Sequence, residues 1–231
     1  MSFEIYSGRI DLTEPDGQRF DYERFILTVN PDGTRTLRTL TRSPKGDLLR
    51  DVNQLVAADW RPIEALGRLF YQNKAYGTVL RRVAGDKLQS MIWPQSGEID
   101  TAEFDAPPGM TVGFHPIFHD IWKMSYLDTS HKEWQSILIH TVSNTWNGST
   151  LGHGQQIKGQ ARFDGAERVT TPAGTFECQR FVWKTSHGKV IHLWRTGPHH
   201  LFVKLLVAEG DKKGSVYELS ALETQKVTWP L

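Results

Sequence analysis

The sequence predicts an all-β protein: one large antiparallel sheet curled into an open or closed barrel, with one short helix near residues 116–128. Three observations support this fold class. Runs of about 6 to 10 residues with strand-like patterns recur along most of the chain, turn-forming residues separate them, and a single stretch has helical periodicity. The length of 231 residues suits one large all-β domain.

The first half of the chain contains predicted strands joined by tight turns. Phe25, Leu27 and Val29 share one face of a strand. Residues 30–33 (Asn-Pro-Asp-Gly) then reverse the chain, because Pro presets φ and Gly accepts a positive φ. The same reasoning places further strands at about 34–42, 48–57, 61–72, 79–83, 88–93 and 98–104.

The centre of the chain interrupts this pattern. Two prolines and a glycine at 107–109 end the first strand group, and Pro116 suits the first turn of a helix, where its missing N–H is not needed. Ile117, Ile121 and Met124 recur at i, i+4 and i+7, which predicts a short amphipathic helix from Pro116 to about Asp128. An irregular crossing loop is the alternative.

Strands resume in the second half, and alternation is clearest at 201–207. They are expected at about 135–146, 156–169, 176–183, 190–195, 201–208 and 216–222. We expect one domain over residues 1–231, with a first strand group at 1–105, a helical crossing at 106–130 and a second strand group at 131–231. Two sandwiches that divide near Pro107 are the alternative, although no Gly/Ser-rich linker marks a boundary.

Charge and composition exclude several function classes. Lys and Arg number 27 against 26 Asp and Glu, and no basic block could follow a phosphate backbone, so nucleic acid is not an expected partner. No apolar run approaches the roughly 18 residues of a membrane span. The first nine residues lack a signal-peptide pattern, which predicts a cytoplasmic protein. The single Cys178 forms no intramolecular disulfide, and neither a metal nor a cofactor is expected.

A motif in the last third of the chain resembles a known family. Residues 169–176 (Val-Thr-Thr-Pro-Ala-Gly-Thr-Phe) precede Trp194 and an apolar strand at 201–205. This V-x-T-P-A-G-T-F hairpin resembles an uncharacterised family of bacterial β-barrel proteins related to lipoprotein-carrier folds. The resemblance implies a curved sheet whose concave side holds an apolar molecule. After the turn, Phe176 and Cys178 are expected to begin an inward-facing strand.

The central helix carries the first candidate site. His115, His119, Trp122 and Tyr126 are spaced at i, i+4, i+7 and i+11, so a helix would place them on one face. Two imidazoles beside a phenol are an acid–base surface, suited to proton transfer near neutral pH. Packing of these rings against the barrel is the alternative. A zinc site is not expected, because Pro116 stands where the zinc motif has Glu.

Further candidates lie in apolar strands. His140 lies within 137–142, and His192 shares a strand face with Trp194, so each imidazole either finds a partner inside the barrel or faces its cavity. Arg81 alternates with two valines and could project a positive charge inward, able to bind a carboxylate or phenolate. A solvated position at the rim is the alternative for Arg81.

These features predict a cofactor-free cytoplasmic enzyme that performs acid–base chemistry on a hydrophobic, aromatic small molecule. Lyase-type C–C cleavage or elimination is favoured over isomerase or hydrolase chemistry. The predicted catalytic residues are His115, His119, Tyr126 and His140, and the predicted substrate-binding residues are Trp122, His192, Trp194 and Arg81. A non-catalytic carrier or sensor of an apolar small molecule is the alternative. A third hypothesis is a partner-binding module, such as a homodimer whose interface is formed by exposed aromatic residues.

Overall fold

The computed structural model describes residues 2–141, 151–185 and 188–228, and it confirms the all-β fold class with one short helix. The strands are β1 (Ser2–Thr13), β2 (Arg19–Val29), β3 (Arg35–Arg42), β4 (Leu48–Val56), β5 (Pro62–Tyr71), β6 (Lys74–Ala84), β7 (Lys87–Pro94), β8 (Asp100–Asp105), β9 (Met110–Gly113), β10 (Gln135–Thr141), β11 (Gln155–Thr171), β12 (Gly174–Lys184), β13 (Val190–Thr196), β14 (Leu201–Glu209) and β15 (Val216–Thr228). The helix α1 (Ile117–Trp122) follows β9.

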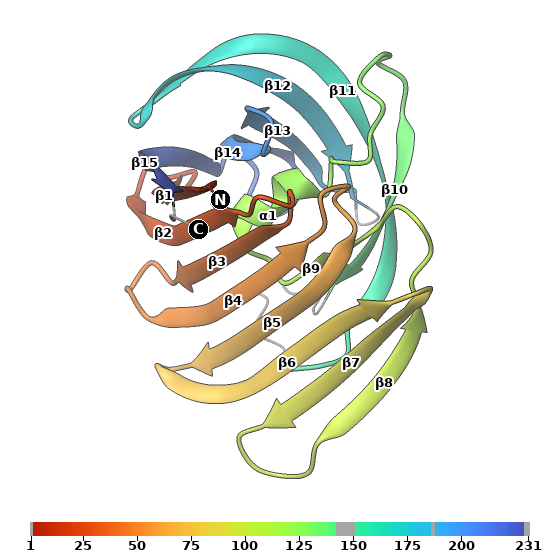
Figure 1. Ribbon diagram of the computed structural model, residues 1–231. Helices are drawn as coiled ribbons and strands as arrows, with labels where there is room; N and C mark the ends of the chain where they lie inside the picture. Colours follow the sequence, from red (N-terminus) through yellow and green to blue (C-terminus); the bar gives the residue numbers. More distant parts are fainter. Residues whose placement is uncertain (1, 142–150, 186–187, 229–231) are drawn as a thin grey trace.

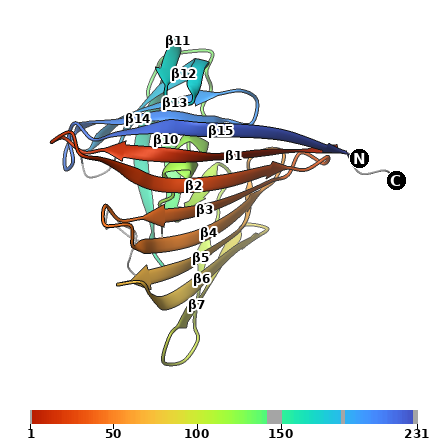
Figure 2. The same cartoon turned by 90° about the vertical axis from the view of Figure 1, so that its left-hand side faces the viewer.

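The described strands form a single sheet in the order β8-β7-β6-β5-β4-β3-β2-β1-β15-β14-β13-β12-β11-β10-β9. Neighbouring strands are antiparallel except for the parallel pair β9 and β10. The first and last strands meet in the middle of the sheet, with Ser2 opposite Thr228 and Thr13 opposite Val216 (Figure 2). The two edges are β8 and β9, which are consecutive in the chain but do not pair, so the barrel is open.

The turn chemistry that the sequence predicts is present at the β2–β3 hairpin. Gly33 has φ +82°, and its N–H donates to the carbonyl of Asn30 at 2.9 Å. The predicted hairpin at 79–93 is the β6–β7 pair. Two strands, β1 and β9, were not predicted, and residues 142–146 of the predicted strand at 135–146 lie outside the described residues.

The edge of the sheet at β9 lies inside the curl, where β9 contacts β5 (Figure 1). Strands β9 and β10 therefore have apolar side chains packed on both faces. Ile137 and Ile139 join one core cluster together with α1, whereas Leu138 packs on a second cluster with Met110 and Val112. We call the second cluster the seam compartment; it comprises Val52, Ala65, Val79, Leu88, Ile92, Ala106, Met110, Val112 and Phe114.

Helix α1 is wholly buried and is capped by a side chain from β2. The N–H groups of its first two residues donate to the two carboxylate oxygens of Glu23, each at 2.9 Å, and the Thr41 hydroxyl donates to the same carboxylate at 3.0 Å. Arg50 on β4 donates to the carbonyl of His115 at 2.8 Å. Burial raises the pKa of Glu23 to about 7, although its backbone donors and Arg50 act in the opposite direction.

The helix is shorter than the predicted span of 116–128. It ends at Trp122, and the N–H groups of Met124, Ser125 and Leu127 donate to carbonyls three residues earlier, as in tight turns. His115 precedes the helix with φ +62°. Of the four residues predicted to share one helix face, only His119 and Trp122 are therefore in α1, and the expected single stripe does not form.

We predict that Glu23→Ala lowers the free energy of unfolding by about 3 to 5 kcal/mol, because it removes a buried carboxylate near Arg50 and leaves two helix N–H groups without their acceptor. Glu23→Gln should cost less, since the amide oxygen still accepts. Urea unfolding measures both values. Glu64→Ala, at an exposed position of β5, is the control and should change stability by less than about 0.5 kcal/mol. A Glu23→Ala protein as stable as its parent would show that the cap is dispensable.

Candidate functional site

Four polar side chains converge at the seam compartment, and we call them the seam polar group: Arg81 on β6, Ser90 on β7, His140 on β10 and His153. His140 Nε2 donates to the carbonyl of His153 at 2.9 Å, and His153 Nδ1 lies 2.9 Å from the Ser90 hydroxyl. Arg81 Nη2 donates to the same carbonyl of His153. The Phe104 ring lies 4.6 Å from that of His140 and forms an apolar wall. Strands β6 and β7 lie near one edge of the sheet and β10 lies near the other, so the curl of the sheet brings side chains from both edges together.

Burial controls the charge of this group. Desolvation, assisted by the positive charge of Arg81, lowers the pKa of His140 to about 4, so its imidazole is neutral at physiological pH. Desolvation alone lowers the pKa of Arg81 to about 9, and the guanidinium stays protonated at neutral pH. His153 Nε2 lies 3.0 Å from the carboxylate of Asp100, whose side chain is 70% exposed at the rim.

The residues predicted from the central segment lie apart from this group. His115 Nε2 is 3.0 Å from the Thr141 hydroxyl. His119 is buried, its Nδ1 has no hydrogen-bond partner among the described residues, and burial moves its pKa well below 6.5. Trp122 packs at 5.6 Å from Trp60, while Tyr126 is 38% exposed. Tyr126 and His140 therefore do not face a common reaction space with His119.

His192 and Trp194 share a strand face, but that face points away from the main core. His192 is paired with Leu206 and Trp194 with Lys204, whereas the intervening Leu193 faces the core. The two rings are stacked at 6.1 Å. Cys178 packs in this small outer cluster with Trp194, so the expectation that Phe176 and Cys178 begin an inward-facing strand is wrong for Cys178.

A bulge between Phe163 and Gly165 changes the register of the long β11–β12 hairpin.

A second histidine contact site lies at the turn between β13 and β14, where His200 is partly buried. His200 stacks on Trp60 with ring centroids 4.1 Å apart, and its Nδ1 accepts a hydrogen bond from Arg195 at 2.9 Å and lies 2.9 Å from the Ser125 hydroxyl. Desolvation and then the positive charge of Arg195 lower the pKa of His200 to about 2. This imidazole is held neutral as a structural acceptor.

Sequence reasoning missed His153, Ser90, Glu23 and Arg50. A signal existed for Glu23, which alternates with Phe25 and therefore shares the inner face of β2. Arg50 likewise alternates with buried positions of β4. His153 follows residues outside the described range and has no periodic pattern around it. Only the fold brings His153 to Arg81.

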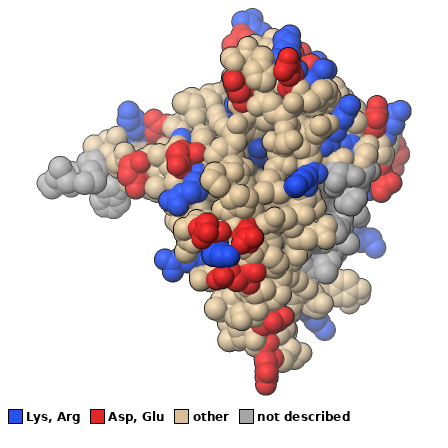
Figure 3. Space-filling model, turned by 90° about the vertical axis from the view of Figure 1, so that its right-hand side faces the viewer, with Lys and Arg blue, Asp and Glu red and all other residues tan. Residues whose placement is uncertain are grey.

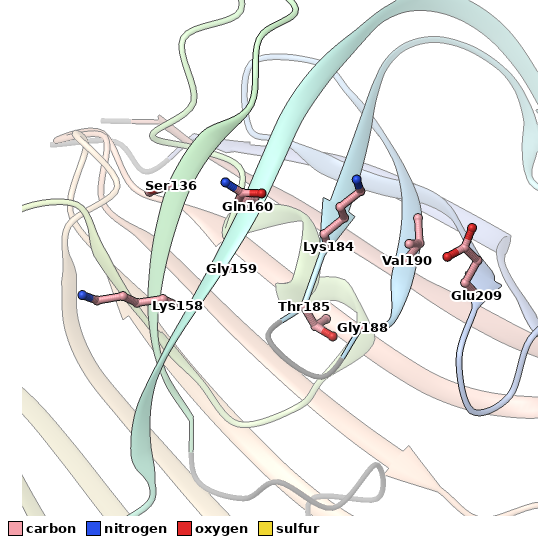
Figure 4. Close-up of a pocket in the computed structure, with 9 residues that line it drawn as sticks. All are labelled: Ser136, Lys158, Gly159, Gln160, Lys184, Thr185, Gly188, Val190 and Glu209. Atoms are coloured by element: carbon pink, nitrogen blue, oxygen red, sulfur yellow. The ribbon is translucent and has the colours of Figure 1, made fainter.

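A pocket of about 550 Å³ lies on the outer face of the sheet at β10–β14 (Figure 4). Its residues form one cross-strand row, since Gln160 is opposite Lys184, Lys184 is opposite Val190 and Val190 is opposite Glu209. Trp183, next to Lys184, faces the core instead. Val190 is the single aliphatic side chain among the described lining residues, so this pocket does not suit an apolar ligand.

A second pocket of about 470 Å³ also lies on the outer face, over β1–β3 and β15. Its apolar lining residues are Phe25, Ile26, Leu40 and Ala221. Arg9, Arg24 and Arg38 surround them, and each guanidinium is paired with an aspartate. Neither outer pocket contains the seam polar group.

The surface gives little indication of a charged partner. Figure 3 shows acidic and basic side chains interspersed over one face of the molecule. Among the described residues, no helix has the length and apolarity to cross a membrane, and no three His, Cys, Asp or Glu side chains gather as metal ligands.

Comparison with known proteins shows similarity in fold. No protein-family model and no curated protein matches the chain. The chain is similar to a β-barrel-like protein of a domain of unknown function, DUF1849, from Brucella abortus, with 10% identity, coverage of 97% of each chain and a TM-score of 0.53. This similarity supports a β-barrel-like fold.

Two further solved structures give lower scores. A "putative lipoprotein" from Parabacteroides distasonis has 9% identity, covers 94% of each chain and has a TM-score of 0.36. A "putative exported protein" with a YmcC-like fold from Bacteroides fragilis has 12% identity, covers 96% of this chain and 95% of its own, and has a TM-score of 0.33.

The predictions of a cytoplasmic location and of a histidine enzyme are wrong on this comparison. The structure with a TM-score of 0.53 is described as a β-barrel-like protein of unknown function, and the two lower-scoring structures are named a lipoprotein and an exported protein. The location was inferred from the first nine residues, most of which simply form β1. The enzyme was inferred from imidazoles in apolar elements, and the structure places these imidazoles in separate contacts. An aromatic ligand and a homodimer stay predictions.

We predict that acid destabilises the protein through its buried histidines. His119, His140 and His200 have lowered pKa values in the fold, so below about pH 6.5 the unfolded chain binds protons that the folded chain does not. Each histidine should lower the free energy of unfolding by about 1.4 kcal/mol per pH unit of acidification, and for His140 this continues to about pH 4.

Glu23 acts with the opposite sign. Its pKa is raised from 4.5 to about 7, so the stability it contributes below 4.5 is lost as the pH rises through about 7. Glu23→Gln should therefore steepen the acid dependence between these values by about 1.4 kcal/mol per pH unit. Urea midpoints measured from about pH 5 to pH 7.5 in both proteins check this. Equal slopes would refute the assignment to Glu23.

Proposed function

We propose that this protein is a non-catalytic carrier or sensor of an apolar small molecule, which it binds in the seam compartment. The observation that carries the proposal is the open seam. Strands β8 and β9 do not pair, and the apolar side chains beside them form a cluster separate from the core around α1. Val83, Phe104, Leu138 and Leu151 pack on this cluster while remaining partly exposed. Partly exposed apolar side chains around an unclosed seam are a suitable entrance for an apolar ligand.

The histidine contacts support a binding role without catalysis. A general acid or base needs a pKa near the working pH and a position facing the substrate. Burial instead keeps His140 and His200 neutral, with pKa values of about 4 and about 2, and each is engaged by a backbone or side-chain partner. These imidazoles act as fixed hydrogen-bonding groups within the fold.

The other side of β9 and β10 is filled by α1 and the residues that follow it. Phe118, Ile121 and Met124 of the α1 region are fully buried against that face of the sheet. Because α1 fills that side, the compartment between β4–β8 and β9–β10 is the better place for a ligand. The curved sheet implied by the hairpin resemblance is consistent with this location.

We predict that the protein binds Nile red, a neutral apolar dye, with a rise in fluorescence, and that octanol displaces it. Leu138→Asp, which places a charge on the seam compartment, should weaken dye binding at least about tenfold, because a desolvated carboxylate is unfavourable there. Leu40→Asp, in the outer pocket over β1–β3 and β15, is the matched control and should bind the dye as the parent does. Circular dichroism establishes that both variants are folded.

The proposal fails if the folded parent gives no saturable dye signal. It also fails if Leu40→Asp, and not Leu138→Asp, loses the dye, since the ligand would then occupy the outer face.

A further inference from the structure

Arg81 is a buried cation that an apolar ligand alone does not explain. Its side chain is fully buried on the inner face of β6, in a cross-strand row with Ala65 and Ser90. The Phe114 ring lies 5.2 Å from its guanidinium carbon. Gly154 passes so close that a Cβ there would lie 2.7 Å from Arg81 Nη2, so the guanidinium is tightly enclosed on that side.

The hydrogen bonds of Arg81 are incomplete. Nη2 donates to the carbonyl of His153 and, at 3.5 Å, to that of Gly152. Nε and Nη1 are buried and have no acceptor among the described residues. Guanidinium N–H groups are strong donors that are almost always paired when buried. Within the described part of the chain, an acceptor is therefore missing beside Nε and Nη1.

Arg81 also lacks a counter-charge among the described residues, and so do the buried Arg35 and Arg195. Those two guanidiniums have other acceptors, since Arg35 donates to the carbonyls of Ala57 and Ala58 and Arg195 donates to Gln179 and His200. No carboxylate among the described residues pairs with Arg81, and burial is the one cause that lowers its pKa to about 9. A buried charge without a partner is strongly unfavourable, so an anionic group that reached it would be stabilised.

The groups facing Arg81 are otherwise close to neutral. His140 on β10 is uncharged because its pKa is about 4, and Ser90 on β7 carries no charge. His153 lies between Ser90 and Asp100, and the Asp100 carboxylate is at the exposed rim. The walls are the rings of Phe104 and Phe114. One positive charge in apolar surroundings complements one negative charge on an apolar body.

We propose that the ligand of the seam compartment is an apolar monocarboxylate whose carboxylate accepts hydrogen bonds from Nε and Nη1 of Arg81. This inference rests on the proposed function, because it names the chemical class of the same ligand. A single guanidinium matches a carboxylate better than a doubly charged phosphate monoester. The Phe114 ring covers the guanidinium, and we expect it to turn aside when the carboxylate binds.

Octanoate and octanol test this, because they share an apolar chain and differ in the charged group. Each is titrated against the protein with bound Nile red. We expect octanoate to displace the dye at a concentration at least about tenfold lower than octanol does. Arg81→Met should bind both compounds equally. Arg82→Met is the matched control, since Arg82 is the next residue on β6 and is exposed, and it should keep the preference for octanoate.

The comparison of octanoate with octanol in the parent protein stays decisive if Arg81→Met does not fold. Equal displacement by octanoate and octanol in the parent overturns the inference while leaving the proposed function intact. Retention of the preference in folded Arg81→Met overturns it as well. Absence of dye binding in the parent instead refutes the proposed function.

Discussion

The capping of α1 by Glu23 is the interaction on which the interior of this fold depends. A helix of six residues has no independent stability, so it needs packing and acceptors for its first N–H groups. Glu23 supplies both acceptors, and Arg50 holds the residue before Pro116. Because α1 lies between β9 and β10 in the chain, this anchor also positions the two strands that divide the interior. The seam compartment exists on one side of them only because α1 is fixed on the other.

Alternation of apolar residues was sufficient to predict the fold class and most strands. It failed at β1, where Ser7, Gly8 and Arg9 conceal the pattern, and at β9, which has four residues between Pro-Gly and the helix. Arg81 points inward, which is one of the two positions that its alternation with Val79 left open. Its neighbour His153 could not be predicted, because the two residues are 72 positions apart in the sequence and only the folded sheet brings them together.

The histidines show why residue type alone misled. Imidazoles within apolar strands are expected to be either paired or functional, and sequence does not distinguish the two. Here burial removes their charge and the fold provides their partners, as His200 shows with Trp60 and Arg195. A charged side chain is more informative, because burial cannot easily neutralise arginine.

Since β1 and β15 unite both strand groups in one sheet, we also propose that residues 1–231 fold as one domain.

The pairing of β1 with β15 has a consequence for how the chain folds. Every other antiparallel pair joins strands adjacent in sequence, so two meanders can form locally and early. The central pair instead closes a loop of nearly the whole chain, with the entropic cost that such a closure carries. During synthesis β1 is made first and its partner last. The free edges of β1 and β15 therefore pair in one late event, and the sheet is completed from its middle.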